Sequence, residues 1–254
     1  MKNRFCIVLS IIFLIFIASA SGQQTSIDTV KNSNNLKFKY SSLILPGILL
    51  SYGFIGLDND MLIYTDREVT DEVTENIDEK ATIDDFSQYV SFLSVYGLNA
   101  IGIKGKNDFR TRTTVLVSAY IIMGSTVTTI KSIAKIRRPD GSTKNSFPSG
   151  HTATAFMGAE FLWQEYKNVS VWYGITGYTI AAGTGFFRIY NERHWLTDVA
   201  AGAGIGILST KAAYWINPYL NRKLFRNKQT NQSSAIVYPF YNGHQLGAGL
   251  AICF

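Results

Sequence analysis

Lysine, arginine, histidine and aspartate side chains gather in three short clusters between Lys131 and Asp198. Lys131, Arg138 and Arg188 can neutralise the charge of a phosphate dianion. His151 and His194 can attack phosphorus or carry a proton between reacting atoms. Together these residue types predict a site that binds a phosphate ester and cleaves it.

The spacing of these residues favours a single shared site. Lys131 and Arg138 are seven residues apart, about two helical turns, so they share a face if this stretch is helical. His194 and Asp198 are four residues apart, which lets the carboxylate orient the imidazole. The segment Pro148 to His151 precedes an apolar run and predicts a helix N-terminus, where backbone N–H groups bind phosphate oxygens.

The motifs Lys-x6-Arg-Pro, Pro-Ser-Gly-His and Arg-x5-His-x3-Asp resemble those of the type 2 phosphatidic acid phosphatase (PAP2) superfamily. That superfamily also includes bacterial acid phosphatases and vanadium haloperoxidases. All three motifs occur here in order within 68 residues, which argues against a chance match. One position departs from the pattern, because Phe187 stands where the family usually has a serine before the third-motif arginine. This change removes a hydroxyl donor and leaves every charged group in place.

The resemblance implies a role for each residue of the motifs. His194 would be the nucleophile that forms a phosphohistidine, Asp198 would hold its ring, and His151 would be the general acid and base. The phosphate-binding residues would be Lys131, Arg138, Ser149, Gly150 and Arg188. Each residue also has a non-catalytic alternative. Asp198 could cap a helix, His151 could only donate a hydrogen bond to the phosphate, and the cations could be solvated side chains. The sequence shows no ligand spacing typical of metal sites, so neither a metal ion nor a cofactor is expected.

The composition of the chain and its apolar segments indicate the fold class. The chain has 254 residues, of which 46% are hydrophobic and only 17% charged, against about 25% charged in typical soluble domains. Apolar segments recur at 41–57, 86–103, 113–130, 152–163, 169–187 and 199–216. They predict an all-α bundle of about six helices, which the resemblance implies is PAP2/haloperoxidase-like, embedded in a membrane. Several segments are near the lower length limit for a span, so a bundle that crosses no membrane is the rival.

The ends of the chain differ in character from its middle. Residues 1–22 have the basic, apolar and small-residue regions of a signal peptide, or form an N-terminal anchor. Residues 23–220 are expected to form the phosphatase domain. Residues 221–254 are expected to be a basic linker and a short C-terminal β-hairpin, because Asn242-Gly243 separates two apolar runs.

The distribution of charge predicts an orientation. Residues 58–85 hold 11 of the 18 acidic residues and are expected to form a long loop with some helix. Basic residues cluster at 104–112 and 222–228, which the positive-inside rule places in the cytoplasm. The segments 58–85, 131–148 and 188–194 then share the outer side, and 41–57 is expected to be re-entrant or interfacial.

These observations predict a metal-independent phosphatase of a bacterial inner membrane, with its site facing the periplasm. Its partners would be the membrane and a phosphorylated lipid, such as lipid A, undecaprenyl pyrophosphate, phosphatidylglycerophosphate or phosphatidic acid. No nucleic-acid partner is expected, and the sequence does not indicate whether there is a protein partner. The alternatives are a soluble periplasmic acid phosphatase and a non-catalytic anion-binding membrane protein. A haloperoxidase is disfavoured because such relatives are usually much larger.

Overall fold

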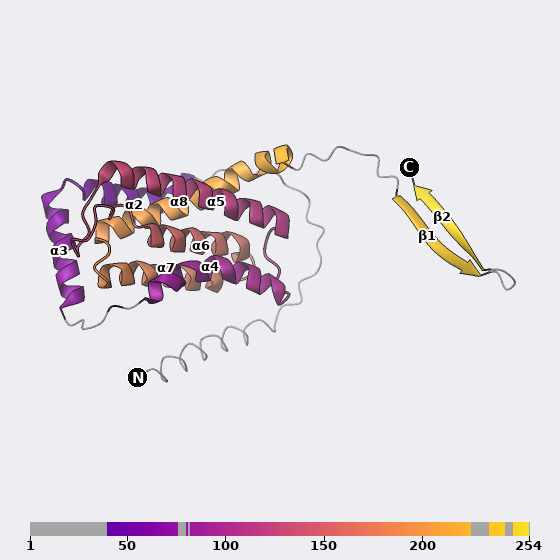
Figure 1. The fold of residues 1–254 in the computed structure, drawn as a ribbon, viewed down its shortest axis with the longest axis horizontal. Helices are drawn as coiled ribbons and strands as arrows, with labels where there is room; N and C mark the ends of the chain where they lie inside the picture. The colour runs from indigo at the N-terminus through magenta and orange to yellow at the C-terminus, as the bar shows by residue number, and fades with distance from the viewer. Residues whose placement is uncertain (1–39, 76–79, 81, 225–233, 242–245, 254) are drawn as a thin grey trace, which may run out of the picture. The chain divides into compact units, whose positions relative to one another are not determined.

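The computed structural model describes residues 40–75, 80, 82–224, 234–241 and 246–253, and most of these residues form a bundle of helices (Figure 1). The predicted signal segment 1–22 lies outside these ranges. The helical elements are η1 (Tyr40–Leu43), α2 (Ile44–Ile55), α3 (Asp60–Thr74), α4 (Ile83–Ala100), α5 (Phe109–Ala134), α6 (Gly150–Tyr166), α7 (Val171–Tyr190) and α8 (Leu196–Leu224).

Each of the six apolar segments forms one helix, so the all-α prediction for the bundle is confirmed. The described ranges contain seven α-helices rather than about six, because the acidic segment contributes α3. Asn59 starts this helix, since its side chain accepts a hydrogen bond from the Leu62 N–H at 3.1 Å. The segment is mostly polar, and its helical period is therefore hard to see in the sequence.

Helix α6 is the centre of the bundle. It packs against α4, α5, α7 and α8, and 12 of its residues are buried, so it is enclosed by the other helices. Glycines of α8 allow the closest approach: a Cβ at Gly202 would lie 2.5 Å from the Ser149 carbonyl oxygen, and one at Gly206 would lie 2.3 Å from that of Ala153. Small residues therefore bring the backbones of α6 and α8 together.

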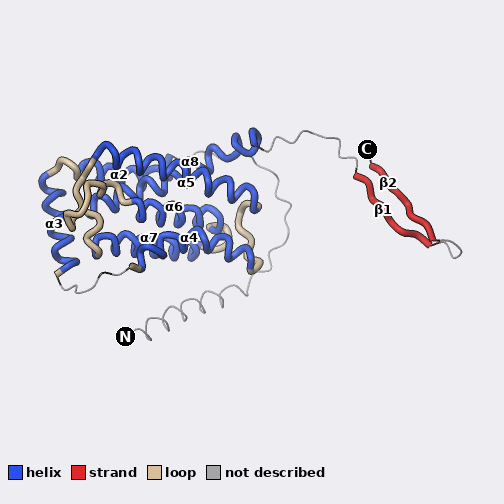
Figure 2. Tube along the Cα trace, in the orientation of Figure 1, coloured by secondary structure: helices blue, strands red, loops and turns tan. Residues whose placement is uncertain are grey.

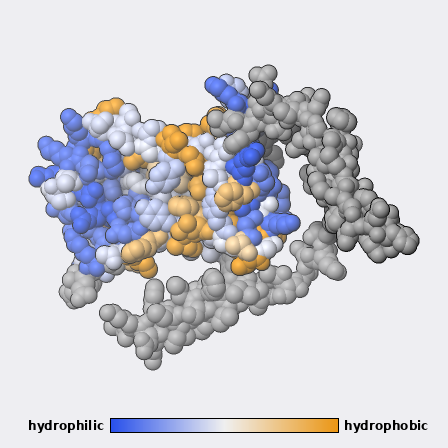
Figure 3. Space-filling view, turned by 45° about the vertical axis from the view of Figure 1, so that its right-hand side comes forward, coloured by the Kyte–Doolittle hydropathy of each residue, from blue (hydrophilic) through white to orange (hydrophobic). Residues whose placement is uncertain are grey.

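The outer helices expose large apolar side chains. Two helices, α5 and α8, are long and apolar enough to cross a membrane among the described residues, and a third span is possible if α2 and α3, bent by 97°, act together. Ile48, Leu93, Ile121, Trp172 and Ile175 are all exposed. Figure 3 shows hydrophobic residues across the middle of one face and hydrophilic residues gathered at its left-hand side. This distribution suits a bundle surrounded by lipid.

The loops that carry the predicted phosphate-binding motifs lie at one end of the bundle, beside α3 (Figure 2). Phe147, fully buried, anchors the loop before α6 through an edge-on contact with Phe54, with ring centroids 5.2 Å apart. The Asp140 N–H donates to the Glu192 carbonyl at 3.2 Å, which ties this loop to the α7–α8 connection. The predicted grouping of 131–148 with 188–194 is therefore correct.

Two strands follow the bundle, β1 (Ser234–Tyr241) and β2 (Leu246–Cys253), and they pair in antiparallel fashion. Residues 242–245 and the side chains of both strands lie outside what the structure describes. The predicted C-terminal hairpin is therefore not established as a packed part of the fold.

Candidate active site

The imidazole of His194 and the carboxylate of Asp198 face each other across the start of α8. Their Nδ1 and Oδ2 atoms are 3.4 Å apart, and both side chains are buried, at 2% and 0% exposed. Helix α8 begins at Leu196, so Asp198 is in its first turn and His194 lies just before it. With Nδ1 turned toward the carboxylate, Nε2 is the ring nitrogen left for attack.

Asp198 also caps its own helix. The same Oδ2 atom accepts a hydrogen bond from the Trp195 N–H at 2.9 Å, as a residue in the third helical position does in a capping box. Both the predicted orienting role and the capping alternative are thus compatible with the geometry. Ser146, which sequence reasoning missed, donates to Oδ2 as well and lies 3.5 Å from His194 Nδ1.

The turn after α7 fixes His194 relative to Arg188. The Arg188 carbonyl oxygen accepts hydrogen bonds from the backbone N–H groups of Arg193, at 3.0 Å, and of His194, at 3.2 Å. Glu192 has a positive φ of 55°, which lets the chain turn back sharply. The predicted nucleophile and one predicted phosphate ligand therefore belong to one compact turn.

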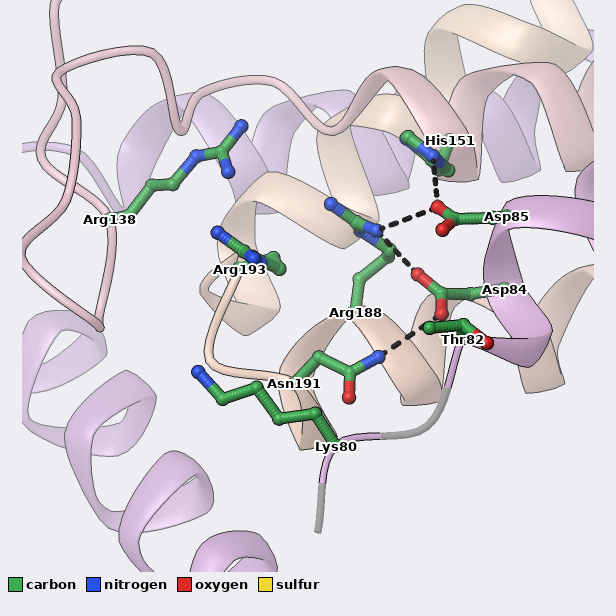
Figure 4. Close-up of a pocket in the computed structure, with 9 residues that line it drawn as sticks. All are labelled: Lys80, Thr82, Asp84, Asp85, Arg138, His151, Arg188, Asn191 and Arg193. Carbon is green, nitrogen blue, oxygen red and sulfur yellow. Dashed lines mark hydrogen bonds and ion pairs between the residues drawn. The ribbon is translucent and has the colours of Figure 1, made fainter.

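A cavity of about 380 Å³ opens at this end of the bundle (Figure 4). It is lined by Lys80, Thr82, Asp84, Asp85, Arg138, His151, Arg188, Asn191 and Arg193. The structure therefore brings three of the predicted residues together here, namely Arg138, His151 and Arg188. Lys131, Ser149, Gly150, His194 and Asp198 do not line it.

Two of those remaining residues are engaged with the backbone. Lys131 Nζ donates to the carbonyl oxygens of Asn145, at 2.5 Å, and of Ser146, at 3.1 Å. The Ser149 N–H donates to the Asp198 carbonyl at 3.0 Å, and the Ser149 side chain caps α6 by accepting from the Thr152 N–H. Of the backbone N–H groups predicted to bind phosphate at the start of α6, that of Ser149 is therefore bonded to α8 instead.

Two carboxylates that the sequence analysis did not single out contact the predicted residues of the cavity. Arg188 Nη1 donates to Asp84 Oδ2, and it lies 3.8 Å from Asp85 Oδ1. His151 Nε2 lies 3.1 Å from the same Asp85 oxygen. Asp84 is 104 residues from Arg188 in sequence, and no spacing rule connects residues that far apart.

Burial lowers the pKa of both candidate histidines, and the shift is large only for His194. Burial lowers the pKa of His194 to about 4; Asp198 opposes this shift, while Lys131 and Arg188 add to it. Burial, followed by the charge of Arg188, lowers the pKa of His151, and Asp85 opposes that shift. A neutral His194 keeps the lone pair that attack on phosphorus requires. Over the described ranges, no group of three or more His, Cys, Asp or Glu residues is placed to hold a metal ion.

Phe187, the residue in place of the family serine, is part of an aromatic group beside the site. Its ring centroid lies 5.9 Å from that of Phe186 and 5.7 Å from that of Tyr190. Phe186 is 49% exposed, so this aromatic group presents an apolar surface on α7.

The arrangement of motifs agrees with comparisons to known proteins. Residues 112–222, which contain all three motifs, match the model of the PAP2 superfamily. This part of the chain belongs to the PAP2 superfamily. The family predicted from the three motifs is therefore confirmed.

Two curated bacterial proteins are similar to this chain. The lipid A 1-phosphatase of Porphyromonas gingivalis is 38% identical over 165 residues, which are 61% of this chain and 37% of that protein. The bacitracin transport permease protein BcrC of Bacillus licheniformis is 36% identical over 77 residues, 30% of this chain and 36% of its own length. This chain thus spans little more than a third of the length of these curated relatives.

A solved structure supports the PAP2 fold. The transmembrane PAP2-type phosphatidylglycerolphosphate phosphatase of Bacillus subtilis aligns with a TM-score of 0.50 at 21% identity, covering 70% of this chain and 98% of that one. This likeness concerns the fold, and within the described residues α5 and α8 have the length and apolar composition that a membrane span requires.

Proposed function

We propose that this protein is a metal-independent phosphatase that hydrolyses a phosphomonoester or pyrophosphate of a membrane lipid. The observation that carries the proposal is the buried His194–Asp198 pair, joined by one turn to Arg188, whose guanidinium lines a cavity with Arg138 and His151. The cations would bind the oxygens of the phosphate and offset the charge that develops as the bond breaks.

The proposed reaction has two displacement steps. His194 Nε2 attacks phosphorus, the bond to the leaving oxygen breaks, and His151 gives that oxygen a proton. Water then attacks the phosphohistidine while His151 takes up the water proton, and inorganic phosphate leaves. His194 is 1% exposed and does not line the cavity, so the proposed attack requires the cavity wall to move and open a path from the phosphorus to Nε2.

Lipid A is the first substrate to test. The support is the similarity to the Porphyromonas gingivalis protein, which extends over 165 residues of this chain. The large apolar side chains exposed on the outer helices suit a substrate whose acyl chains lie in the surrounding lipid. The proposed orientation places the cavity at the periplasmic face of the inner membrane, where such a lipid would be reached from outside.

The test is phosphate release by purified, detergent-solubilised protein. The panel contains lipid A, undecaprenyl pyrophosphate, phosphatidylglycerophosphate, phosphatidic acid and a small ester such as p-nitrophenyl phosphate. We expect release from a lipid, and a loss of at least about a thousandfold in kcat with His194→Ala. Turnover confined to the small ester would favour an acid phosphatase instead. Equal release by wild type and His194→Ala would reject the proposed enzyme.

A further inference from the structure

The first turn of α4 projects two adjacent carboxylates into the cavity (Figure 4). Asp84 is almost completely buried, at 1% exposed, whereas the Asp85 side chain is 55% exposed. The helix start that carries them is fastened to α7, because Ser87 Oγ lies 2.7 Å from Thr184 Oγ1. Asp84 and Asp85 therefore lie on the same anchored helical turn, but only the Asp85 side chain has room to move.

Asp84 is held at both of its oxygens. Oδ2 accepts from Arg188 Nη1, and Oδ1 accepts from Asn191 Nδ2 at 3.1 Å. The Arg188 side chain is itself only 8% exposed, so it has little freedom to point elsewhere. Removing the charge of Asp84 would leave the buried guanidinium with only the more distant and exposed Asp85 as a counter-ion, 3.8 Å away. Asp84 is thus placed to set the direction of Arg188.

Asp85 contacts the two groups that would handle the phosphate. Its Oδ1 lies 3.1 Å from His151 Nε2 and 3.8 Å from Arg188 Nη1. An ionised carboxylate in this position offers the same negative oxygen to these donors as a phosphate would. It also repels an incoming dianion. The exposed side chain can rotate toward solvent while its backbone stays fixed.

We propose that α4 completes the phosphate site with two carboxylates of opposite effect: Asp84 positions Arg188, and Asp85 occupies Arg188 and His151 until the substrate phosphate displaces it. This inference rests on the proposed function and deepens it. Asp84 makes the site competent to bind an anion, and Asp85 makes binding weaker than the cations alone would allow. A weakly held phosphate is also a product that leaves readily.

Asp84→Asn and Asp85→Asn form a matched pair, because each removes one charge from the same helical turn without changing the shape of the side chain. The first measurement is binding of inorganic phosphate by titration calorimetry, which needs no turnover. We expect Asp84→Asn to raise the Kd at least about tenfold and Asp85→Asn to lower it about three- to tenfold. Arg188→Ala should remove binding in either background.

Steady-state kinetics on the best lipid substrate gives the second measurement. Asp84→Asn should lower kcat/KM about a hundredfold with both parameters affected, whereas Asp85→Asn should lower KM. Equal shifts in the same direction for both variants would overturn the inference, as would unchanged Kd values. If Asp84→Asn does not fold, Asn191→Ala decides, because it frees Asp84 Oδ1 and should raise the phosphate Kd as well.

The two proposals fail in different ways. A wild-type protein that releases no phosphate from any substrate, while its phosphate affinity still responds oppositely to the two variants, would reject the proposed reaction alone. An active enzyme in which both variants bind phosphate like wild type would reject the roles of Asp84 and Asp85 and leave the proposed reaction standing.

Discussion

At the level of single residues, Asp198 combines two tasks through one oxygen atom. Its Oδ2 accepts from the Trp195 N–H that starts α8, and it also faces His194 Nδ1. The cap fixes the carboxylate and the carboxylate fixes the ring, so helix formation itself helps to orient the proposed nucleophile.

Asp198→Asn should separate these two tasks. The amide oxygen of asparagine can still accept from Trp195, but the charge that favours the correct ring orientation is lost. We expect kcat to fall by at least about a hundredfold while the melting temperature in detergent changes by only a few degrees. Phosphate release and thermal unfolding of the same preparations measure both quantities. Unchanged turnover would contradict the orienting role.

The pH dependence of stability should report on His194. Its pKa is about 4 in the folded protein because of burial, against 6.5 in an unfolded chain. The unfolded state therefore binds more protons between these values, and stability is lost as pH falls from 6.5 toward 4. The loss should be about 2–3 kcal/mol at most.

The control for this effect is His194→Asn, which cannot titrate in this range. Its melting temperature should fall less steeply than that of wild type between pH 6.5 and 4. Parallel pH profiles for the two proteins would show that other groups account for the acid sensitivity.

At the level of helices, the close contact of α6 with α8 joins two motifs that are far apart in the chain. Gly202 lies one turn after Asp198, and its lack of a side chain lets the α8 backbone approach Ser149. The hydrogen bond from the Ser149 N–H to the Asp198 carbonyl, 3.0 Å long, depends on this approach.

Gly202→Ala should weaken this junction. The new Cβ would lie 2.5 Å from the Ser149 carbonyl oxygen, a contact that requires backbone movement. We expect a loss of about 1–3 kcal/mol of stability together with reduced kcat. Gly183→Ala on α7 is the matched control, because its Cβ would meet no atom within 4 Å and alanine favours helix. Equal behaviour of the two variants would argue against the junction.

The sequence predicts the helices and the three motifs better than it predicts the residues that contact and orient the motif side chains. Motif residues are recognisable because their spacing is local, as with His194 and Asp198 four positions apart. Asp84 is one of 11 acidic residues in its segment, and only the packing of α4 against α7 distinguishes it from the rest. Ser146 likewise gains its partner Asp198 only when α6 and α8 meet.

At the level of the whole molecule, the two ends of α6 can report the orientation in the membrane. Lys144 precedes this helix and Asn168 follows it, and both are exposed. If the proposed periplasmic orientation holds, these two positions face opposite sides of the membrane.

Single cysteines at the two positions test this orientation. In a background of Cys6→Ser and Cys253→Ser, Lys144→Cys should react with a membrane-impermeant maleimide in intact spheroplasts. Asn168→Cys should react only after the cells are opened. The reverse pattern would place the cavity in the cytoplasm, and labelling of both positions in intact spheroplasts would contradict a spanning α6.

The turn in which the Arg188 carbonyl accepts from Arg193 and His194 sets the spacing between Arg188, proposed to bind the phosphate, and His194, the proposed nucleophile, over seven residues. That spacing is local, so it does not depend on the angle at which the surrounding helices cross. We expect changes in lipid thickness that tilt the helices to leave the relative position of Arg188 and His194 unchanged. The same independence would let new headgroup preferences evolve through the outer loops while the reaction chemistry stays intact.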